Sequence, residues 1–371
     1  MKIIILLLAI LGVNPCFASA MAASSSTVVT NSEELGIPEL YRSSLPTLVL
    51  KAEVDLTATV KAEAILEYLQ LMGSGDALTG DSRASYLSNL EASITKEEPI
   101  QMVILGFPFK SGNLTKVLGP SFDMGDYLGL LRLEHTANAI EKAIGVKCEV
   151  HIINQEPYLG EVFSVVESDL GLRLIDPREY QIGFLQLIRT CQHLHLGEDL
   201  ARLYDEAIKK DRETHTAAKY KAILENTHLK PLFMAELENS ALTAALYAKL
   251  ETKDIKSKAQ KEKYLKTLRD QMVLAYELGV NVFRDVVKVA YGNMLRLSVH
   301  GDESKVGINF ASTPGMEATH SCVPWHGTLL CTLAELGKIS FDLTQVSKIK
   351  GARKVSETVS GIELSYMLVK K

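Results

Sequence analysis

Two stretches of this chain hold the side chains that bind oxyanions and move protons. In residues 294–300, apolar residues alternate with Arg296, Ser298 and His300. Arginine offers a planar pair of donors to phosphate, serine a small donor, and histidine a group that binds or releases a proton near neutral pH. Because strict alternation is typical of a strand with one apolar face, we predict that the three polar residues share the other face.

A second alternating segment, residues 305–310, adds Lys305 and Asn309 to this set. The residues between the two segments suit a four-residue loop, so we predict an antiparallel hairpin with the polar faces matched. The alternative interpretation is an ordinary hairpin with one face in water, which antiparallel strands often have. The residues on the shared surface would be Arg296, Ser298, His300, Lys305 and Asn309.

The second stretch is a long loop between a predicted strand at 102–105 and a predicted helix at 124–144. Ligands in open α/β sheets lie outside the carboxyl ends of strands, and helix N-termini attract anions. Asp123 and Asp126 stand where the helix would begin, and their alternative role is to cap it. The donors that an anion site here would use are Lys110, Ser111, Asn113 and Lys116.

A third, shorter segment contains the only tryptophan of the chain. It reads Val-Pro-Trp-His-Gly over residues 323–327, so that His326 directly follows Trp325. His326 is a candidate for proton transfer. The alternative is a packed tryptophan beside a hydrogen-bonded histidine.

The elements that must position these segments alternate between strands and helices. Residues 197–291 show helical periodicity, and their lysines are interleaved with acidic residues, which is typical of a solvated helix face. We therefore predict an α/β fold with a Rossmann-like mixed sheet layered with helices, plus a helical insert at 197–291. The predicted helices are 57–72, 124–144 and 177–194, and the predicted strands are 102–105, 147–153, 162–166, 294–299, 305–310, 327–333 and 361–369.

Composition and the first residues set the class of protein. The chain has 371 residues, of which 47% are hydrophobic and 23% charged, as in globular proteins. Its formal net charge of −5 gives no general attraction for nucleic acid. Residues 1–20 have the apolar run and small-residue ending of a signal peptide, which predicts export; a start at Met21 would instead leave the protein in the cytoplasm.

The rest of the chain divides simply. Residues 21–56, which are Ser/Thr-rich over 22–31, are predicted to be flexible. One α/β domain is predicted over 57–371, with no further apolar run long enough to span a membrane. The cysteines are too few and too scattered for a disulfide scaffold. Cys191, His193 and His195 are interpreted as ordinary polar residues at a helix end rather than a metal site.

The three chemical segments together, in this order, resemble the isonitrile (isocyanide) synthase family of pyoverdine and dityrosine biosynthesis. The resemblance covers about residues 100–330, and Gly112 and Leu114 stand where prolines are usual in the family. Asp126 replaces a glutamate. The motifs that carry the resemblance are Phe107-Pro108-Phe109-Lys110-Ser111 running into Lys116-Val117-Leu118-Gly119-Pro120, then Arg296-Leu297-Ser298-Val299-His300, then Pro324-Trp325-His326-Gly327.

The resemblance implies an enzyme of secondary metabolism that needs no redox cofactor and no metal. The α-amine of an amino acid such as tyrosine or tryptophan would attack ribulose 5-phosphate as co-substrate, and an oxygenase could act downstream. The resemblance implies proton transfer by His300 or His326, with Asp123 or Asp126 holding the amine or orienting a base. Substrate and phosphate would bind to Lys110, Ser111, Asn113, Lys116, Arg296, Ser298 and Lys305.

The predicted leader favours a second hypothesis. Sugar phosphates are metabolites of the cell interior, so an exported protein would seldom meet ribulose 5-phosphate. The alternative is a diverged, non-catalytic protein that binds a phosphorylated or carboxylated small molecule.

Overall fold

The computed structural model describes 36–50, 56–73, 78–106, 110, 117–154, 177–197, 225, 259, 291–298, 301, 303–308, 310, 324, 327–333, 339–346 and 349–370. The predicted signal peptide, the predicted strand at 162–166 and nearly all of the predicted helical insert lie outside these residues.

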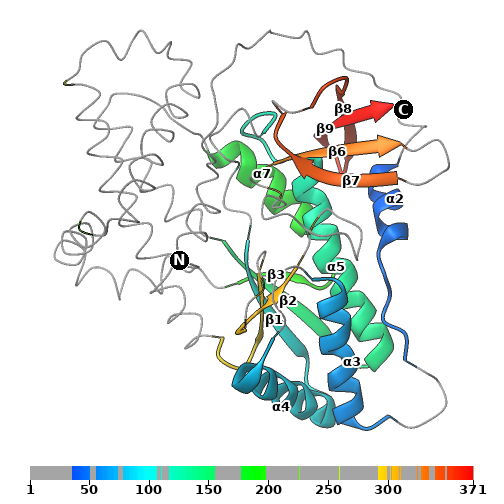
Figure 1. Cartoon of the computed structure of the whole chain (residues 1–371), viewed down its shortest axis with the longest axis vertical. Coiled ribbons are helices and arrows are strands. Elements are labelled where there is room, and N and C mark those ends of the chain that lie inside the picture. The colour runs from blue at the N-terminus through cyan, green and yellow to red at the C-terminus, as the bar shows by residue number, and fades with distance from the viewer. Residues whose placement is uncertain are drawn as a thin grey trace.

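A five-stranded parallel sheet forms the centre of the described structure (Figure 1). Its order is β3-β2-β1-β4-β5, and all four neighbouring pairs run parallel. The strands predicted at 102–105, 147–153 and 294–299 are confirmed as its three central strands. The strands are β1 (Ile100–Gly106), β2 (Cys148–Asn154), β3 (Leu194–Leu196), β4 (Leu295–Ser298) and β5 (Val306–Gly307).

The predicted hairpin between the strands at 294–299 and 305–310 is wrong. β4 and β5 run parallel, with Leu297 opposite Val306 and Ser298 opposite Gly307. The alternation along β4 is confirmed, since Leu295 and Leu297 are buried whereas Arg296 and Ser298 are only partly buried. A period of two specifies which residues share a face, but it does not specify the direction of the neighbouring strand.

The helix predicted to run from 177 to 194 ends sooner. α7 (Pro177–Ile188) stops at Ile188, and the amides of Thr190 and Cys191 close its last turn on the carbonyls of Leu187 and Ile188. The chain then enters β3, so His195 lies on a strand and not at a helix end. Three residues are too few for a period-two pattern to emerge, which is why this edge strand was not predicted.

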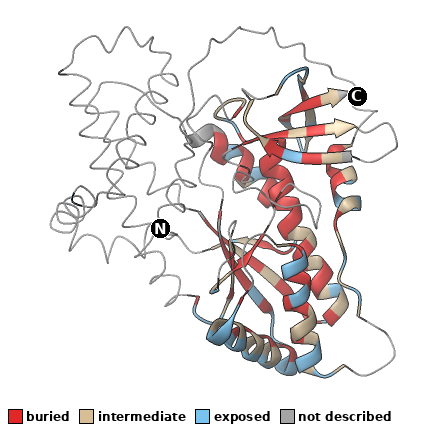
Figure 2. Cartoon of the chain, in the orientation of Figure 1, coloured by how far each residue is buried: buried red, intermediate tan, exposed pale blue. Residues whose placement is uncertain are grey.

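Helices α3 (Ala58–Leu71) and α5 (Met124–Ile144) lie side by side against the parallel sheet, and α4 (Gly80–Lys96) precedes β1 (Figure 1). The helices predicted at 57–72 and 124–144 are confirmed. α5 is buried along most of its length, whereas α4 exposes one face (Figure 2). α5 therefore forms the central helix of the core.

Part of the segment predicted to be flexible, 21–56, is a packed helix. α2 (Ile37–Ser44) begins with Ile37 and Pro38, and Ile37 and Tyr41 are 0% and 1% exposed. The Tyr41 ring packs edge-on against Phe341 with ring centroids 5.5 Å apart. These apolar contacts outweigh the polar composition around them, because burying two large side chains offsets the entropy of ordering a short helix.

A second, mixed sheet packs against α2 and the first half of α5 (Figure 1). Its order is β7-β6-β9-β8, with β6 and β9 parallel and the other two pairs antiparallel. The α/β fold is confirmed: one wholly parallel sheet and one mixed sheet are layered with helices. The strands are β6 (Thr328–Leu333), β7 (Ile339–Thr344), β8 (Arg353–Val359) and β9 (Ile362–Lys370), of which β6 and β9 confirm the strands predicted at 327–333 and 361–369.

None of the helices in the described ranges combines the length and the apolar character needed to cross a membrane.

Candidate active site at the start of helix α5

Two aspartates fix the first turn of α5. Asp123 is the N-cap residue, and its Oδ1 accepts hydrogen bonds from the amides of Gly125 (2.9 Å) and Asp126 (3.3 Å). Asp126 reciprocates, since its Oδ2 accepts a hydrogen bond from the amide of Asp123 at 3.0 Å. This is a capping box, so the capping role considered for both residues is confirmed.

The same two carboxylates hold the ammonium group of Lys110. Its Nζ lies 2.9 Å from Oδ2 of Asp123 and 2.8 Å from Oδ2 of Asp126. Lys110 is 1% exposed, and the aspartates are 4% and 0% exposed. Nζ also donates to the carbonyl oxygen of Pro324 at 2.7 Å, with the carbonyl of Gly327 at 3.5 Å. Lys110 therefore joins the loop after β1, the start of α5 and the segment before β6.

This environment changes what Lys110 can do. An ammonium group has three protons to donate, and three oxygens lie within 2.9 Å of Nζ. Burial acts to lower the pKa of Lys110, but the attraction of Asp123 and Asp126 outweighs it and the pKa is raised. Lys110 is therefore a fixed cation, and three protein oxygens already lie around its Nζ.

Asp123 is the titratable member of the cluster. Burial raises its pKa to about 7, with repulsion from Asp126 adding to the rise and attraction from Lys110 opposing it. Its Oδ2 makes no hydrogen bond of good geometry, although Nζ of Lys110 lies 2.9 Å away. A carboxyl group that changes protonation near neutral pH suits general acid–base chemistry.

Tyr180 belongs to this cluster and was not among the predicted site residues. Its hydroxyl donates to Oδ1 of Asp126 at 3.1 Å from the buried face of α7. Phe122 packs on it with ring centroids 5.2 Å apart. The sequence indicates only that Tyr180 and Phe184 share one face of a helix. Which residue the Tyr180 hydroxyl contacts depends on how α7 packs on α5.

The second motif lies on the neighbouring strand. Arg296 pairs with Val103 in the register of β4 with β1, and β1 leads directly into the loop that carries Lys110. Arg296, Ser298 and Lys305 are all partly buried. The structure thus places the strand of the second motif beside the strand that precedes the first motif. The other predicted site residues, Ser111, Asn113, Lys116, His300 and His326, lie outside the described residues, as does Asn309.

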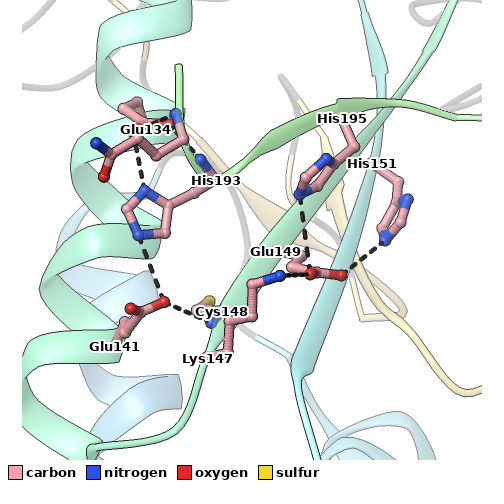
Figure 3. Close-up of polar contacts among 9 residues, drawn as sticks. Glu134, Glu141, Lys147, Cys148, Glu149, His151, His193 and His195 are labelled. Atoms are coloured by element: carbon pink, nitrogen blue, oxygen red, sulfur yellow. Dashed lines mark hydrogen bonds and ion pairs between the residues drawn. The ribbon is translucent and has the colours of Figure 1, made fainter.

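His193 has a structural role (Figure 3). Its Nδ1 lies 2.8 Å from Oε1 of Glu134 and its Nε2 lies 3.4 Å from Oε2 of Glu141, and both glutamates come from α5. The Glu134 carboxylate also accepts the amides of Gln192 and His193. These contacts fasten the turn before β3 to α5, which agrees with the interpretation of His193 as an ordinary polar residue.

Polar residues also line the opposite face of β2 and β3 (Figure 3). His151 and His195 pair across the two strands, with ring centroids 5.7 Å apart. Glu149 lies between them, 3.8 Å from Nε2 of His151 and 3.9 Å from Nε2 of His195. Within the described part of the chain, no group of three or more His, Cys, Asp or Glu residues is arranged to hold a metal ion.

Comparisons with known proteins bear on these motifs. Residues 90–348 match the family model described as "Pyoverdine/dityrosine biosynthesis protein". L-tryptophan isonitrile synthase AmbI1 of Fischerella ambigua is 28% identical over 89 residues, which make up 24% of this chain and 28% of that protein. Isocyanide synthase xanB of Aspergillus fumigatus is 21% identical over 305 residues, covering 72% of this chain and 37% of that protein.

A solved structure shares the fold. The crystal structure of PvcA from Pseudomonas aeruginosa matches with a TM-score of 0.56 and 19% sequence identity, covering 83% of this chain and 99% of that one. At this level of identity the likeness concerns the fold alone.

Proposed function

The chain belongs to the pyoverdine/dityrosine biosynthesis protein family, and from this premise we propose that it is an isonitrile synthase. Two relatives named as isonitrile or isocyanide synthases support the proposal. The observation that carries it is the contact of Lys110 with Asp123, Asp126 and the Pro324 carbonyl, because it joins the first and third motifs in one buried cluster.

The proposed reaction condenses the α-amine of an amino acid, tyrosine or tryptophan, with the ketone of ribulose 5-phosphate. Attack of the amine gives a carbinolamine, which loses water to form an imine. Cleavage of both carbon–carbon bonds at the former carbonyl carbon leaves that carbon as the isonitrile. Atom balance is met when the phosphate is also eliminated: the other products are then water, formaldehyde, inorganic phosphate and hydroxyacetone, so no oxidant or reductant is needed.

The described residues suggest a division of work. Lys110 acts as a positioning residue, since its charge fixes the first turn of α5 against the segment before β6. Asp123 exchanges a proton with the amine or with the departing hydroxyl, because burial raises its pKa to about 7. Arg296 and Lys305 remain the candidate phosphate ligands, together with Ser111, Asn113, Lys116 and Ser298. His300 and His326 remain candidates for further proton transfers.

The test is a product assay with the purified full chain. Ribulose 5-phosphate is incubated with each aromatic amino acid, and mass spectrometry follows an amino-acid product with one added carbon and no added oxygen. We expect a product that depends on the sugar phosphate, and a large loss of turnover in Asp123→Asn.

The control is Glu134→Gln, which alters a carboxylate on the same helix that holds His193 instead of Lys110. It should leave turnover nearly unchanged. Failure to form product with any amino acid, together with retained binding of the sugar phosphate, would contradict the synthase and favour a non-catalytic binding protein.

A further inference from the structure

Arg132 is a charged residue inside α5 with no exposed surface. It is 0% exposed and is the bulkiest of the fully buried side chains in the described ranges. Its Nη2 donates to the carbonyl oxygen of Met72 at 3.0 Å, whereas its Nε and Nη1 are buried and make no hydrogen bond of good geometry. Arginine is almost never fully buried unless it is paired, so these unused donors need an explanation.

The described neighbours of Arg132 do not supply a counter-charge. Burial raises the pKa of Tyr41, and both attraction to Arg132 and a side-chain hydrogen bond with it act against this rise. Burial raises the pKa of Tyr68 to about 12, and attraction to Arg132 acts against that rise. Burial lowers the pKa of His135, and repulsion from Arg132 lowers it further. The Tyr68 hydroxyl donates to the Pro46 carbonyl at 3.0 Å, and no carboxylate of the described ranges forms an ion pair with Arg132. Among the residues that the structure describes, the surroundings of Arg132 are therefore polar but not anionic.

We propose that Arg132 is the receiving group of an internal oxyanion site, and that the group it binds is a carboxylate or a phosphate. A guanidinium presents its N–H groups in a planar fork that matches both anions. A buried cation without a partner destabilises the protein, and an anion that reaches the unused donors removes this cost.

The position of Arg132 relates it to β5. The guanidinium lies where the end of α3 meets α5, and Gly73, next to Met72, approaches β5 so closely that a Cβ there would lie 2.9 Å from the Gly307 oxygen. The site thus adjoins β5, the strand that directly follows Lys305. It is separate from the Lys110 cluster, and the proposal does not depend on the isonitrile synthase activity.

The experiment compares the thermal unfolding of the full chain with that of Arg132→Met, an apolar replacement of similar length. Both are measured in a phosphate-free, carboxylate-free buffer and again with inorganic phosphate or acetate added. Arg83→Met is the control, because Arg83 is partly exposed and is paired with Glu63.

An anion site predicts the direction in which the unfolding temperature changes in each protein. Without anions, Arg132→Met should unfold at the same temperature as the wild type or higher, because an unpaired buried charge has been removed. With phosphate or acetate in excess, the wild type and Arg83→Met should rise by about 2 °C or more, and Arg132→Met should not. The anion that produces the shift identifies the ligand group as phosphate or carboxylate.

Two results would overturn the proposal. One is an equal response to both anions in the wild type and Arg132→Met. The other is a wild type that ignores both anions, whether or not Arg132→Met is less stable, because the guanidinium then serves packing alone. Should Arg132→Met not fold, Arg132→Lys replaces it: the lysine keeps the charge but loses the fork, so an anion site predicts a clearly smaller shift than in the wild type.

Discussion

The ammonium of Lys110 lies 2.8 Å from the carboxylate of Asp126, and both side chains are sealed from solvent. The pair is one edge of a cluster in which Asp123, Tyr180 and the Pro324 carbonyl complete the contacts. Buried ion pairs of this kind are costly to break, because removing one partner leaves the other charged and without compensation. The predictions that follow test each member.

Replacing Lys110 with methionine should destabilise the fold by about 3–5 kcal/mol, because two buried carboxylates then lose their counter-ion. Urea denaturation measures the change. Lys147→Met is the control, since the Lys147 side chain is 60% exposed although it also pairs with a glutamate. Equal losses in the two variants would show that Lys110 is not charged in the folded protein.

Replacing Asp123 with asparagine should change how stability depends on pH. The folded pKa of Asp123 is raised from 3.8 to about 7, so the folded protein binds its proton more tightly than the unfolded chain does. The resulting stabilisation is present below pH 4 and is lost as the pH rises through 7. We therefore expect the stability of the wild type relative to Asp123→Asn to fall between about pH 4 and about pH 7 and to level off above it.

Urea midpoints of both proteins at several pH values check this expectation. A relative stability that rises with pH over the same window would mean that Lys110 depresses the pKa of Asp123 and that Asp123 is ionised throughout.

Replacing Tyr180 with phenylalanine removes one hydrogen bond to a charged acceptor, Oδ1 of Asp126. We expect a loss of about 1.5–3 kcal/mol in the free energy of unfolding. Tyr68→Phe is the matched control, because the Tyr68 hydroxyl donates to a neutral carbonyl at 3.0 Å and should cost about 0.5–1.5 kcal/mol. A smaller loss in Tyr180→Phe than in the control would contradict a strong hydrogen bond between Tyr180 and Asp126.

Replacing Gly106 with alanine should strain the end of β1, where the chain enters the loop of Lys110. A Cβ at this position would lie 2.7 Å from Cγ2 of Ile152, whereas a Cβ at Gly119 would meet nothing within 4 Å. Overpacking of this kind costs about 1–3 kcal/mol. Thermal unfolding of Gly106→Ala and Gly119→Ala compares the two sites. If the contact with Ile152 causes the loss of stability, the double variant that carries Gly106→Ala and Ile152→Ala should relieve part of the strain.

The sequence predicted the parts of the fold that repeat with a local period. The apolar run of β1, the alternation in β4 and the helical pattern of α5 each lie within one element, and the structure confirms all three. The direction of β5 was missed because pairing joins residues through space and leaves no trace in the alternation.

The candidate site was foreseen in its residues but not in its contacts. Lys110 and the two aspartates were expected at one place because helix starts follow strand ends in α/β folds. The oxygen that completes the environment of Lys110 belongs to Pro324, 214 positions along the chain, and no local pattern reports such a contact. Arg132 was missed for the same reason, since one charged residue in a helix is normally expected to reach solvent.

The order of strands in the mixed sheet affects when the sheet can form during synthesis of the chain. β9, the last of the four strands in sequence, occupies an interior position between β6 and β8. On the ribosome, β6 and β7 can pair as a local hairpin, but the four-stranded sheet cannot assemble until residues 362–370 have left the exit tunnel. Pro324 and Gly327, which hold Lys110, lie immediately before β6. The segment that holds Lys110 therefore leads into a sheet whose interior position is filled only when β9 is available.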